Sequence, residues 1–277
     1  KAGVKRVVAA MPDPDPRNDG AGFALLKEAG IEVATGVMAD EAAALNPGHI
    51  KLHKEGMPFV RLKLAMSLDG RTALPNGESR WITSEASRAD VQLLRAGASA
   101  LVTGVQTVLD DDPQLRVRDH LSALPHPEET LAVQREVFVL DSNGLTPPDA
   151  RILSLPGTVV VTGKHARPPK NAQHLECKIG KDGRISLPHF FGALAGREHS
   201  EVLLECGATL AGAAMTAGLV DELIIYIAPR FMGAAAKPLL KLPDIVRMSG
   251  LVETAITDVQ RIGPDIKVTA IPATQKP

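Results

Sequence analysis

The sequence predicts an α/β protein with a largely parallel sheet. Apolar, strand-length segments alternate with segments of helical periodicity, and runs that contain Gly, Pro, Asn or Asp separate them. Hydrophobic residues make up 44% of the 277 residues, as in globular proteins. This alternation is typical of domains in which helices cover a parallel sheet. The predicted strands are 4–10, 31–34, 59–66, 100–103, 136–141, 158–162, 201–205, 222–228 and 266–271, and the predicted helices are 23–29, 41–54, 84–95, 189–195 and 210–217.

A domain boundary is predicted near residue 56. The preceding segment contains a β-α-β unit and a helix over 41–54 that Asp40 caps and Gly56 ends. We therefore expect residues 1–56 to be the end of one α/β domain and residues 57–277 to form another. Because the chain begins without methionine and enters a strand at once, we also expect that a preceding part of the protein is missing.

Charge and cysteine content exclude several classes of protein. The 31 basic and 32 acidic residues nearly balance, so neither nucleic acid nor an anionic membrane is an expected partner. No apolar run approaches the roughly 20 residues that span a bilayer, and no signal-peptide pattern opens the chain, which predicts a cytoplasmic protein. Cys177 and Cys206 lack the spacing of zinc ligands, so we expect two reduced thiols and no metal in this chain.

A glycine-containing turn joins the predicted strand 201–205 to the predicted helix 210–217. Its sequence is Cys206-Gly207-Ala208-Thr209-Leu210-Ala211-Gly212. A turn that opens a helix directly after a strand presents free backbone N–H groups and the positive helix end, which suits a phosphate or pyrophosphate. The spacing is not GxGxxG, and a tight turn without any ligand is an equal alternative.

Two loops carry further candidate residues. The only tryptophan, Trp81, lies in the polar stretch 77–83, where it either packs in the core or at its edge, or forms a wall for a ring-shaped ligand. The acidic triplet Asp110-Asp111-Asp112 fits a solvated loop better than a Ca²⁺ or Mg²⁺ site, because the EF-hand spacing is absent.

Arginines are the candidate ligands for a sugar phosphate, because guanidinium groups match phosphate oxygens in pairs. The candidates are Arg95, Arg116 and Arg118, for each of which surface ion pairing is the commoner role. His49 and His53 stand four apart on a predicted helix without a third ligand, so we expect both to be solvated.

Several motifs, taken in order, resemble the bifunctional deaminase/reductase family of riboflavin biosynthesis. They are Leu62-Lys63-Leu64-Ala65-Met66-Ser67-Leu68-Asp69-Gly70-Arg71, the stretches 77–83, 107–113 and 205–212, Asp221-Glu222-Leu223 and Ala228-Pro229. The resemblance covers nearly the whole chain, and an ordered series of motifs is far more specific than any one of them.

The resemblance implies a zinc-dependent pyrimidine deaminase domain followed by a reductase domain with a dihydrofolate-reductase-like fold. The deaminase motifs, His-x-Glu and Pro-Cys-x-x-Cys, have no match here. Residues 1–56 then correspond to the C-terminal remnant of the cytidine-deaminase-like α/β domain, and residues 57–277 to the NADPH-dependent reductase domain. We expect this chain not to deaminate, and expect zinc only in the deaminase portion of the full-length parent.

The resemblance further implies a reaction and an assembly. NADPH would reduce 5-amino-6-(5-phosphoribosylamino)uracil to 5-amino-6-(5-phosphoribitylamino)uracil, with the protein aligning hydride donor and acceptor. The family also implies a homodimer.

Site residues follow by motif. The resemblance implies substrate contacts at Ser79, Arg95, Leu115, Arg118 and Glu205. It implies NADPH contacts at Ala65, Trp81, Thr107, Asp111, Ser142, Gly207, Ala208, Thr209, Leu210, Ala211, Gly212 and Ala213. Lys63 and Glu205 are the candidate catalytic groups beside the reacting ribose, because a charged group facing a cofactor needs a partner that offsets its desolvation. They either transfer a proton or form an ion pair that only positions the substrate.

Two other functions remain open from the sequence. A dihydrofolate-reductase-like enzyme acting on a pterin would share the fold, although the arginines favour a phosphorylated sugar. A catalytically silent NADPH-binding module that regulates a partner would bind the cofactor without turnover. A purely structural protein is not favoured, because the sequence contains no repeats.

Overall fold

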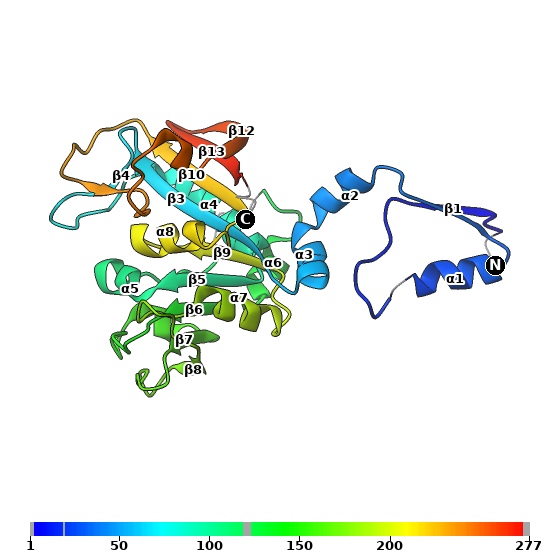
Figure 1. The fold of residues 1–277 in the computed structure, drawn as a ribbon, viewed down its shortest axis with the longest axis horizontal. Coiled ribbons are helices and arrows are strands. Elements are labelled where there is room, and N and C mark those ends of the chain that lie inside the picture. Colours follow the sequence, from blue (N-terminus) through cyan, green and yellow to red (C-terminus); the bar gives the residue numbers. More distant parts are fainter. Residues whose placement is uncertain (1–2, 19, 119–122, 274–277) are drawn as a thin grey trace. The chain divides into compact units, whose positions relative to one another are not determined.

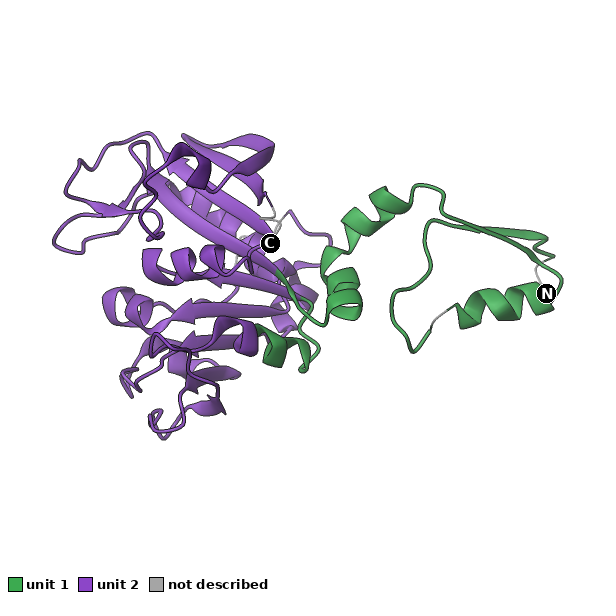
Figure 2. Ribbon diagram, viewed as in Figure 1, with its two compact units in different colours: residues 1–59, 191–200 green, residues 60–190, 201–277 purple. Residues whose placement is uncertain are grey.

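The computed structural model describes residues 3–18, 20–118 and 123–273. The chain divides into two compact units, coloured separately in Figure 2. One unit comprises residues 1–59 and 191–200, and the other comprises residues 60–190 and 201–277. The assignment of residues 1–56 to the end of a deaminase domain stays a prediction.

The first unit contains a small parallel β-α-β arrangement followed by two helices. Strand β1 (Arg6–Ala9) pairs in parallel with β2 (Glu32–Thr35), and α1 (Ala21–Glu28) connects them. The predicted single helix over 41–54 is wrong. The structure has α2 (Ala39–Leu45) and α3 (Pro47–Glu55), because Pro47 has no N–H to continue a helix and takes its first turn instead.

The ends of these two helices test the predicted cap at Asp40 and the predicted helix end at Gly56. Asp40 is not the cap of α2: Met38 holds that position in a left-handed conformation, and Asp40 lies in the first turn. Gly56 ends α3 as predicted, with a φ of 66° that glycine adopts without strain.

The second unit is built on a nine-stranded sheet, shown in Figure 1. The strand order is β12-β13-β10-β3-β9-β5-β6-β7-β8. The bounds are β3 (Phe59–Ser67), β5 (Ala100–Gly104), β6 (Glu136–Leu140), β7 (Thr158–Thr162), β8 (Gln173–Glu176), β9 (Glu201–Glu205), β10 (Glu222–Ala228), β12 (Thr254–Ile262) and β13 (Asp265–Pro272). Strands β9, β5, β6, β7 and β8 pair with one another in parallel in this order, and β10 pairs in parallel with β3. Strand β13 pairs antiparallel with both β10 and β12. The prediction of an α/β fold with a largely parallel sheet is confirmed.

Shorter elements complete this unit. They are the paired strands β4 (Arg71–Ala73) and β11 (Lys237–Pro238), the helices α4 (Glu85–Gly97), α5 (Val105–Asp111), α6 (Pro127–Ala132) and α8 (Ala208–Thr216), and the 3₁₀ turns η1 (Arg151–Ser154) and η2 (Met248–Gly250). Helix α7 (Leu187–Ala195) bridges the unit boundary in sequence. The polar stretch 123–134 contains α6, which Pro127 opens; residues 119–122 lie outside the described part.

Local sequence explains where α4 begins. Ser84 caps this helix, because its side-chain oxygen accepts a hydrogen bond from the Ser87 N–H. The Asp265 carboxylate accepts from the Ser84 N–H at 2.7 Å and from the Ser87 hydroxyl at 2.6 Å, which ties the first turn of α4 to β13.

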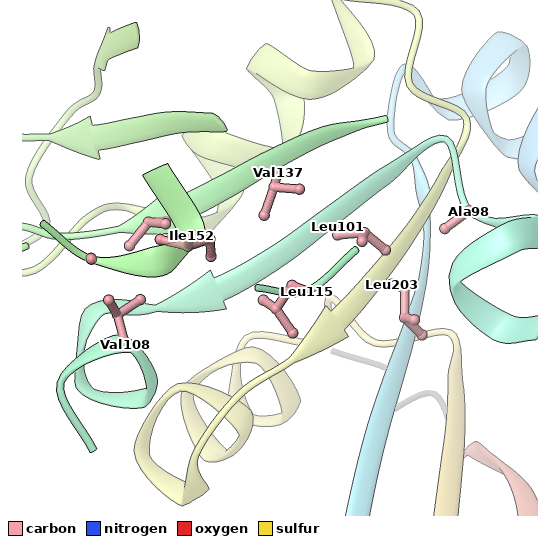
Figure 3. Close-up of a cluster of buried hydrophobic side chains, with 9 residues drawn as sticks. Ala98, Leu101, Val108, Leu115, Val137, Ile152 and Leu203 are labelled. Carbon is pink, nitrogen blue, oxygen red and sulfur yellow. The ribbon is translucent and has the colours of Figure 1, made fainter. Parts of the chain in front are cut away.

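A buried cluster fixes the middle of the sheet (Figure 3). Leu101, Val137 and Leu203 project from β5, β6 and β9, and Val108 of α5 and Leu115 pack over them. Since Val108 and Leu115 are almost fully buried, they anchor the segment 104–118 against the sheet. In the described part of the chain, no helix is long and apolar enough to cross a membrane.

Candidate active site

A cleft of about 1500 Å³ lies in the second unit. It is lined by side chains of β3 and α4, by the residues that follow β6 and β9, and by the start of α8. Ligands of α/β proteins bind at the carboxyl ends of parallel strands, where helix starts also converge. The cleft is therefore the candidate active site.

Three charged side chains form a compact cluster in the cleft wall. The Arg95 guanidinium donates to both carboxylate oxygens of Glu205, from Nε at 2.6 Å and from Nη2 at 3.0 Å. The Lys63 Nζ lies 3.8 Å from Glu205 Oε2. Their side chains are only 11 to 18% exposed. Strands β3 and β9 and helix α4 thus bring together two cations and one carboxylate away from bulk water.

Burial and charge set the protonation of this cluster. Burial would raise the pKa of Glu205, but the charges and hydrogen bonds of Arg95 and Lys63 outweigh it and hold that pKa below its ordinary value. Burial lowers the pKa of Lys63, and the nearby Arg95 charge adds to this, while Glu205 opposes it. Glu205 is consequently a stable anion, and Lys63 holds its proton less firmly than an exposed lysine does.

A second group of arginines lines the same cleft. Arg118 and Arg151 both face it, and the Arg118 backbone N–H is fixed by the Gln92 side chain at 2.9 Å. Burial lowers the pKa of Arg118, and the like charges of Arg116, Arg95 and Arg151 lower it further. Among the described residues, no carboxylate forms an ion pair with Arg118 or Arg151, so this end of the cleft has excess positive charge and suits an anion.

The loop that carries Trp81 is held against the end of α5. The Ser79 hydroxyl donates to Asp111 Oδ1 at 2.9 Å, and Arg80 Nε lies 3.7 Å from the same oxygen. Trp81 is 62% exposed, and the Arg88 guanidinium stacks 4.5 Å from its ring centroid. Trp81 also lines the cleft, and its exposure contradicts burial in the core.

The start of α8 borders the cleft as an open glycine turn. Gly207 precedes the first helical residue, and nothing lies within 4 Å of the position that a Cβ would take there. The Ala211 N–H donates to the Gly207 carbonyl, so the N–H groups before it belong to the unpaired first turn. A phosphate can approach this backbone closely.

The structure brings most of the predicted site residues to this one cleft. Lining residues include Lys63, Ala65, Ser79, Trp81, Arg95, Thr107, Asp111, Leu115, Arg118, Ser142, Glu205, Gly207, Ala208, Thr209, Leu210 and Ala213. Ala211 and Gly212 are buried and do not line it. At Gly212 a Cβ would stand 2.0 Å from the Lys241 carbonyl oxygen, so this glycine permits close packing of the backbone of Lys241.

Sequence reasoning missed several lining residues. Arg151, Arg184, Lys237 and Lys241 add cations to the cleft, and Lys237 Nζ lies 3.8 Å from Asp110 Oδ2. They come from loops and short elements without a recognisable motif. Only the Arg151 position carried a signal, as a basic residue following the strand 136–141 and a Pro-rich turn.

The fold and the cleft define an α/β enzyme domain that binds its ligands at the carboxyl edge of a parallel sheet. Residues 58–268 match the family model described as the RibD C-terminal domain. The riboflavin biosynthesis protein RibD of Escherichia coli is 41% identical over 272 residues, which cover 96% of this chain and 74% of that protein. The chain therefore belongs to the RibD family, and it is an oxidoreductase of riboflavin biosynthesis.

Solved structures agree with this membership. RibD of Acinetobacter baumannii superposes with a TM-score of 0.88 at 39% identity, covering 98% of this chain and 74% of that one. A diaminohydroxyphosphoribosylaminopyrimidine deaminase/5-amino-6-(5-phosphoribosylamino)uracil reductase of Thermotoga maritima superposes with a TM-score of 0.82 at 25% identity, covering 98% of this chain and 72% of that one.

Proposed function

We propose that this chain reduces 5-amino-6-(5-phosphoribosylamino)uracil to 5-amino-6-(5-phosphoribitylamino)uracil with NADPH. The Thermotoga relative bears the name of this reductase. One observation carries the proposal. A single cleft contains both the buried Lys63–Glu205–Arg95 cluster and the excess positive charge at Arg118 and Arg151. A phosphorylated sugar with a reacting carbon needs both features.

The substrate phosphate is assigned to Arg118 and Arg151. Two of the N–H groups of Arg95 already bind Glu205, and a third donates to the Arg116 carbonyl at 3.2 Å. Arg95 therefore contributes charge to the phosphate site while holding Glu205 in place. Ser79 and Leu115 line the same cleft and complete the proposed substrate contacts.

The cleft also fits the cofactor. The unpaired N–H groups at Gly207 and in the first turn of α8 suit the pyrophosphate, and Lys241 lines the same region. Ala65, Trp81, Thr107, Asp111 and Ser142 line the remainder. When bound, NADPH supplies the hydride that the reaction requires.

The proposed reaction requires a proton donor, which this chain can supply. Opening of the ribose ring moves the proton of the exocyclic amine to the ring oxygen and leaves a C1′=N imine. Addition of hydride to C1′ then gives the amine nitrogen an electron pair that must take one proton. Lys63 Nζ is the proposed donor, because its lowered pKa makes it the more acidic of the two cations in the cluster. Glu205 is the proposed positioning partner of Lys63, since it stays ionised.

The test is the loss of the NADPH absorbance band when the purified chain meets the phosphoribosylamino-uracil. Turnover that collapses in Lys63→Met, with NADPH binding retained, supports the reductase and its proton donor. Binding of NADPH without turnover in the wild-type chain would contradict the proposal and support a silent binding module. Turnover of a dihydropterin in place of the phosphorylated substrate would support the pterin alternative.

Three wider predictions accompany this proposal; two rest on the family resemblance, and the location rests on the sequence pattern. They are a homodimeric assembly, a cytoplasmic location, and a zinc-dependent deaminase activity in the full-length parent. Size-exclusion chromatography with light scattering tests the first of them directly.

A further inference from the structure

A buried tyrosine, Tyr226, lies next to Lys63. Tyr226 of β10 is fully buried, and its strand neighbours are Ala65 of β3 and Lys267 of β13. Lys63 Nζ lies 5.8 Å from the Tyr226 ring centroid, and Lys267 Nζ lies 5.9 Å from the same centroid. One aromatic ring therefore contacts two lysine ammonium groups.

Helix α4 fixes the other end of this tyrosine. The Tyr226 hydroxyl donates to Asp90 Oδ2, and the Lys267 Nζ lies 2.7 Å from the same oxygen. Burial raises the pKa of Tyr226, and the Asp90 carboxylate raises it further, so the hydroxyl remains a donor. The ring orientation is consequently set by a hydrogen bond to a carboxylate that Lys267 neutralises.

These contacts extend the charged cluster of the active site. In order along the contacts, the residues are Arg95, Glu205, Lys63, Tyr226, Asp90 and Lys267. Three cations and two carboxylates leave one surplus positive charge. Among the described residues, the charged groups that interact with Lys63 are Glu205 from β9 and Arg95 from α4, and the Lys63 ammonium group also lies over the ring of Tyr226 from β10.

We propose that Tyr226 is a positioning residue for Lys63, and that Lys267 limits its effect. The electron-rich face of the ring attracts an ammonium group, most strongly where water is excluded. It therefore favours the protonated form of Lys63 and holds it beside Glu205. Lys267 competes for the same ring and repels Lys63, so it sets how firmly Lys63 keeps its proton. The role of Lys63 in the reaction rests on the proposed function, whereas its coupling to Tyr226 does not.

The experiment measures the titration of the Lys63 amine directly, by NMR of ¹⁵N-lysine-labelled full chain without substrate, together with the pH dependence of kcat. Tyr226→Leu is expected to lower the titration midpoint of Lys63 by about one pH unit, as loss of a partly desolvated cation–π contact would do. Lys267→Met is expected to move it in the opposite direction. Tyr226→Phe keeps the ring and should move it less than Tyr226→Leu.

Phe138→Leu is the matched control, because it removes an equally buried ring from β6 of the same sheet. It should lower stability and leave the Lys63 titration in place. If Tyr226→Leu and Lys267→Met both leave that titration where it is in the wild type, the inference is overturned. A wild type without turnover would instead contradict the proposed function, and the amine titration would still decide the coupling.

Discussion

Arg95 and Glu205, which lie 110 residues apart in the sequence, form a two-pronged hydrogen-bonded ion pair with N–O distances of 2.6 and 3.0 Å. The pair joins helix α4 to the end of β9 and leaves Lys63 as the third charge at the site. Because the pair is buried, removing either partner strands a charge away from water. The arrangement makes Glu205 a fixed anion against which Lys63 is oriented.

Replacing Glu205 by glutamine is expected to reduce both stability and rate. Loss of the carboxylate leaves Arg95 and Lys63 as unneutralised neighbours, which should cost about 3 kcal/mol in the free energy of unfolding. Misplacement of Lys63 should lower kcat about 100-fold. Urea unfolding and steady-state kinetics measure the two effects.

The matched control for this change is Glu222→Gln. Glu222 forms an ion pair with Arg61, in which Oε2 and Nε are 2.8 Å apart, and neither residue lines the cleft. This substitution should lower stability by about 1 kcal/mol and leave kcat unaffected. A Glu205→Gln enzyme with wild-type kcat would show that Glu205 has no positioning role.

Alanine at Arg118 or at Arg151 is expected to raise KM far more than it lowers kcat. Each guanidinium is proposed to bind the substrate phosphate, and a charge-assisted hydrogen bond contributes about 1.5 to 3 kcal/mol, which corresponds to roughly a 10- to 100-fold change in KM. Steady-state kinetics with the phosphorylated substrate and with its dephosphorylated form provide the measurement. The dephosphorylated substrate should barely distinguish the variants from the wild type.

Arg116→Ala is the control for these variants, because the Arg116 side chain is exposed and does not line the cleft. An equal rise in KM for Arg116→Ala would show that general charge, and not contact with the phosphate, governs binding.

Gly212→Ala is expected to destabilise the second unit, which comprises residues 60–190 and 201–277. A Cβ at Gly212 would stand 2.0 Å from the Lys241 carbonyl oxygen and 2.6 Å from its carbon, so the backbone at Lys241 must shift. Overpacking of this kind costs about 1 to 3 kcal/mol. Thermal unfolding of Gly97→Ala provides the comparison, since nothing lies within 4 Å of a Cβ at the exposed Gly97. Equal melting temperatures for the two variants would refute this explanation of Gly212.

Asp69 is expected to make stability depend on pH in the acid range. Its hydrogen bond from Ser67 and those from the Met232 and Gly233 N–H groups lower the pKa of Asp69 to about 2, from 3.8. A carboxyl group whose pKa is lower in the folded state stabilises the protein at pH values above its unfolded-state pKa. This contribution is lost as the pH falls toward the folded-state pKa. Asp69→Asn should therefore unfold at lower urea than the wild type at neutral pH. The difference should shrink as the pH falls from about 4 to about 2, and a difference independent of pH in that range would exclude the carboxylate as its source.

Much of the fold follows from local sequence. Strands such as 201–205 and 222–228 are identified by runs of apolar residues, and Ser84 and Gly56 mark helix ends by their own side-chain and backbone chemistry. Pro47 is an equally local signal: proline opens a helix and does not continue one, which is why the segment predicted as one helix over 41–54 forms α2 and α3. The exposed strand β12 was missed because both of its faces meet solvent, so its sequence lacks the alternation that identifies a half-buried strand.

The candidate site likewise combines residues that the sequence identifies with contacts that only the tertiary structure creates. The sequence by itself determined which residue types were available, including Lys63, Arg95 and Glu205, and it determined the alternation of strands and helices, because both depend on neighbours along the chain. Only the tertiary structure decided that Arg95 binds Glu205, that Arg151 joins Arg118, and that Tyr226 lies between Lys63 and Lys267. Those pairings depend on strand order and register, which arise from packing between segments far apart in the sequence and leave no local pattern.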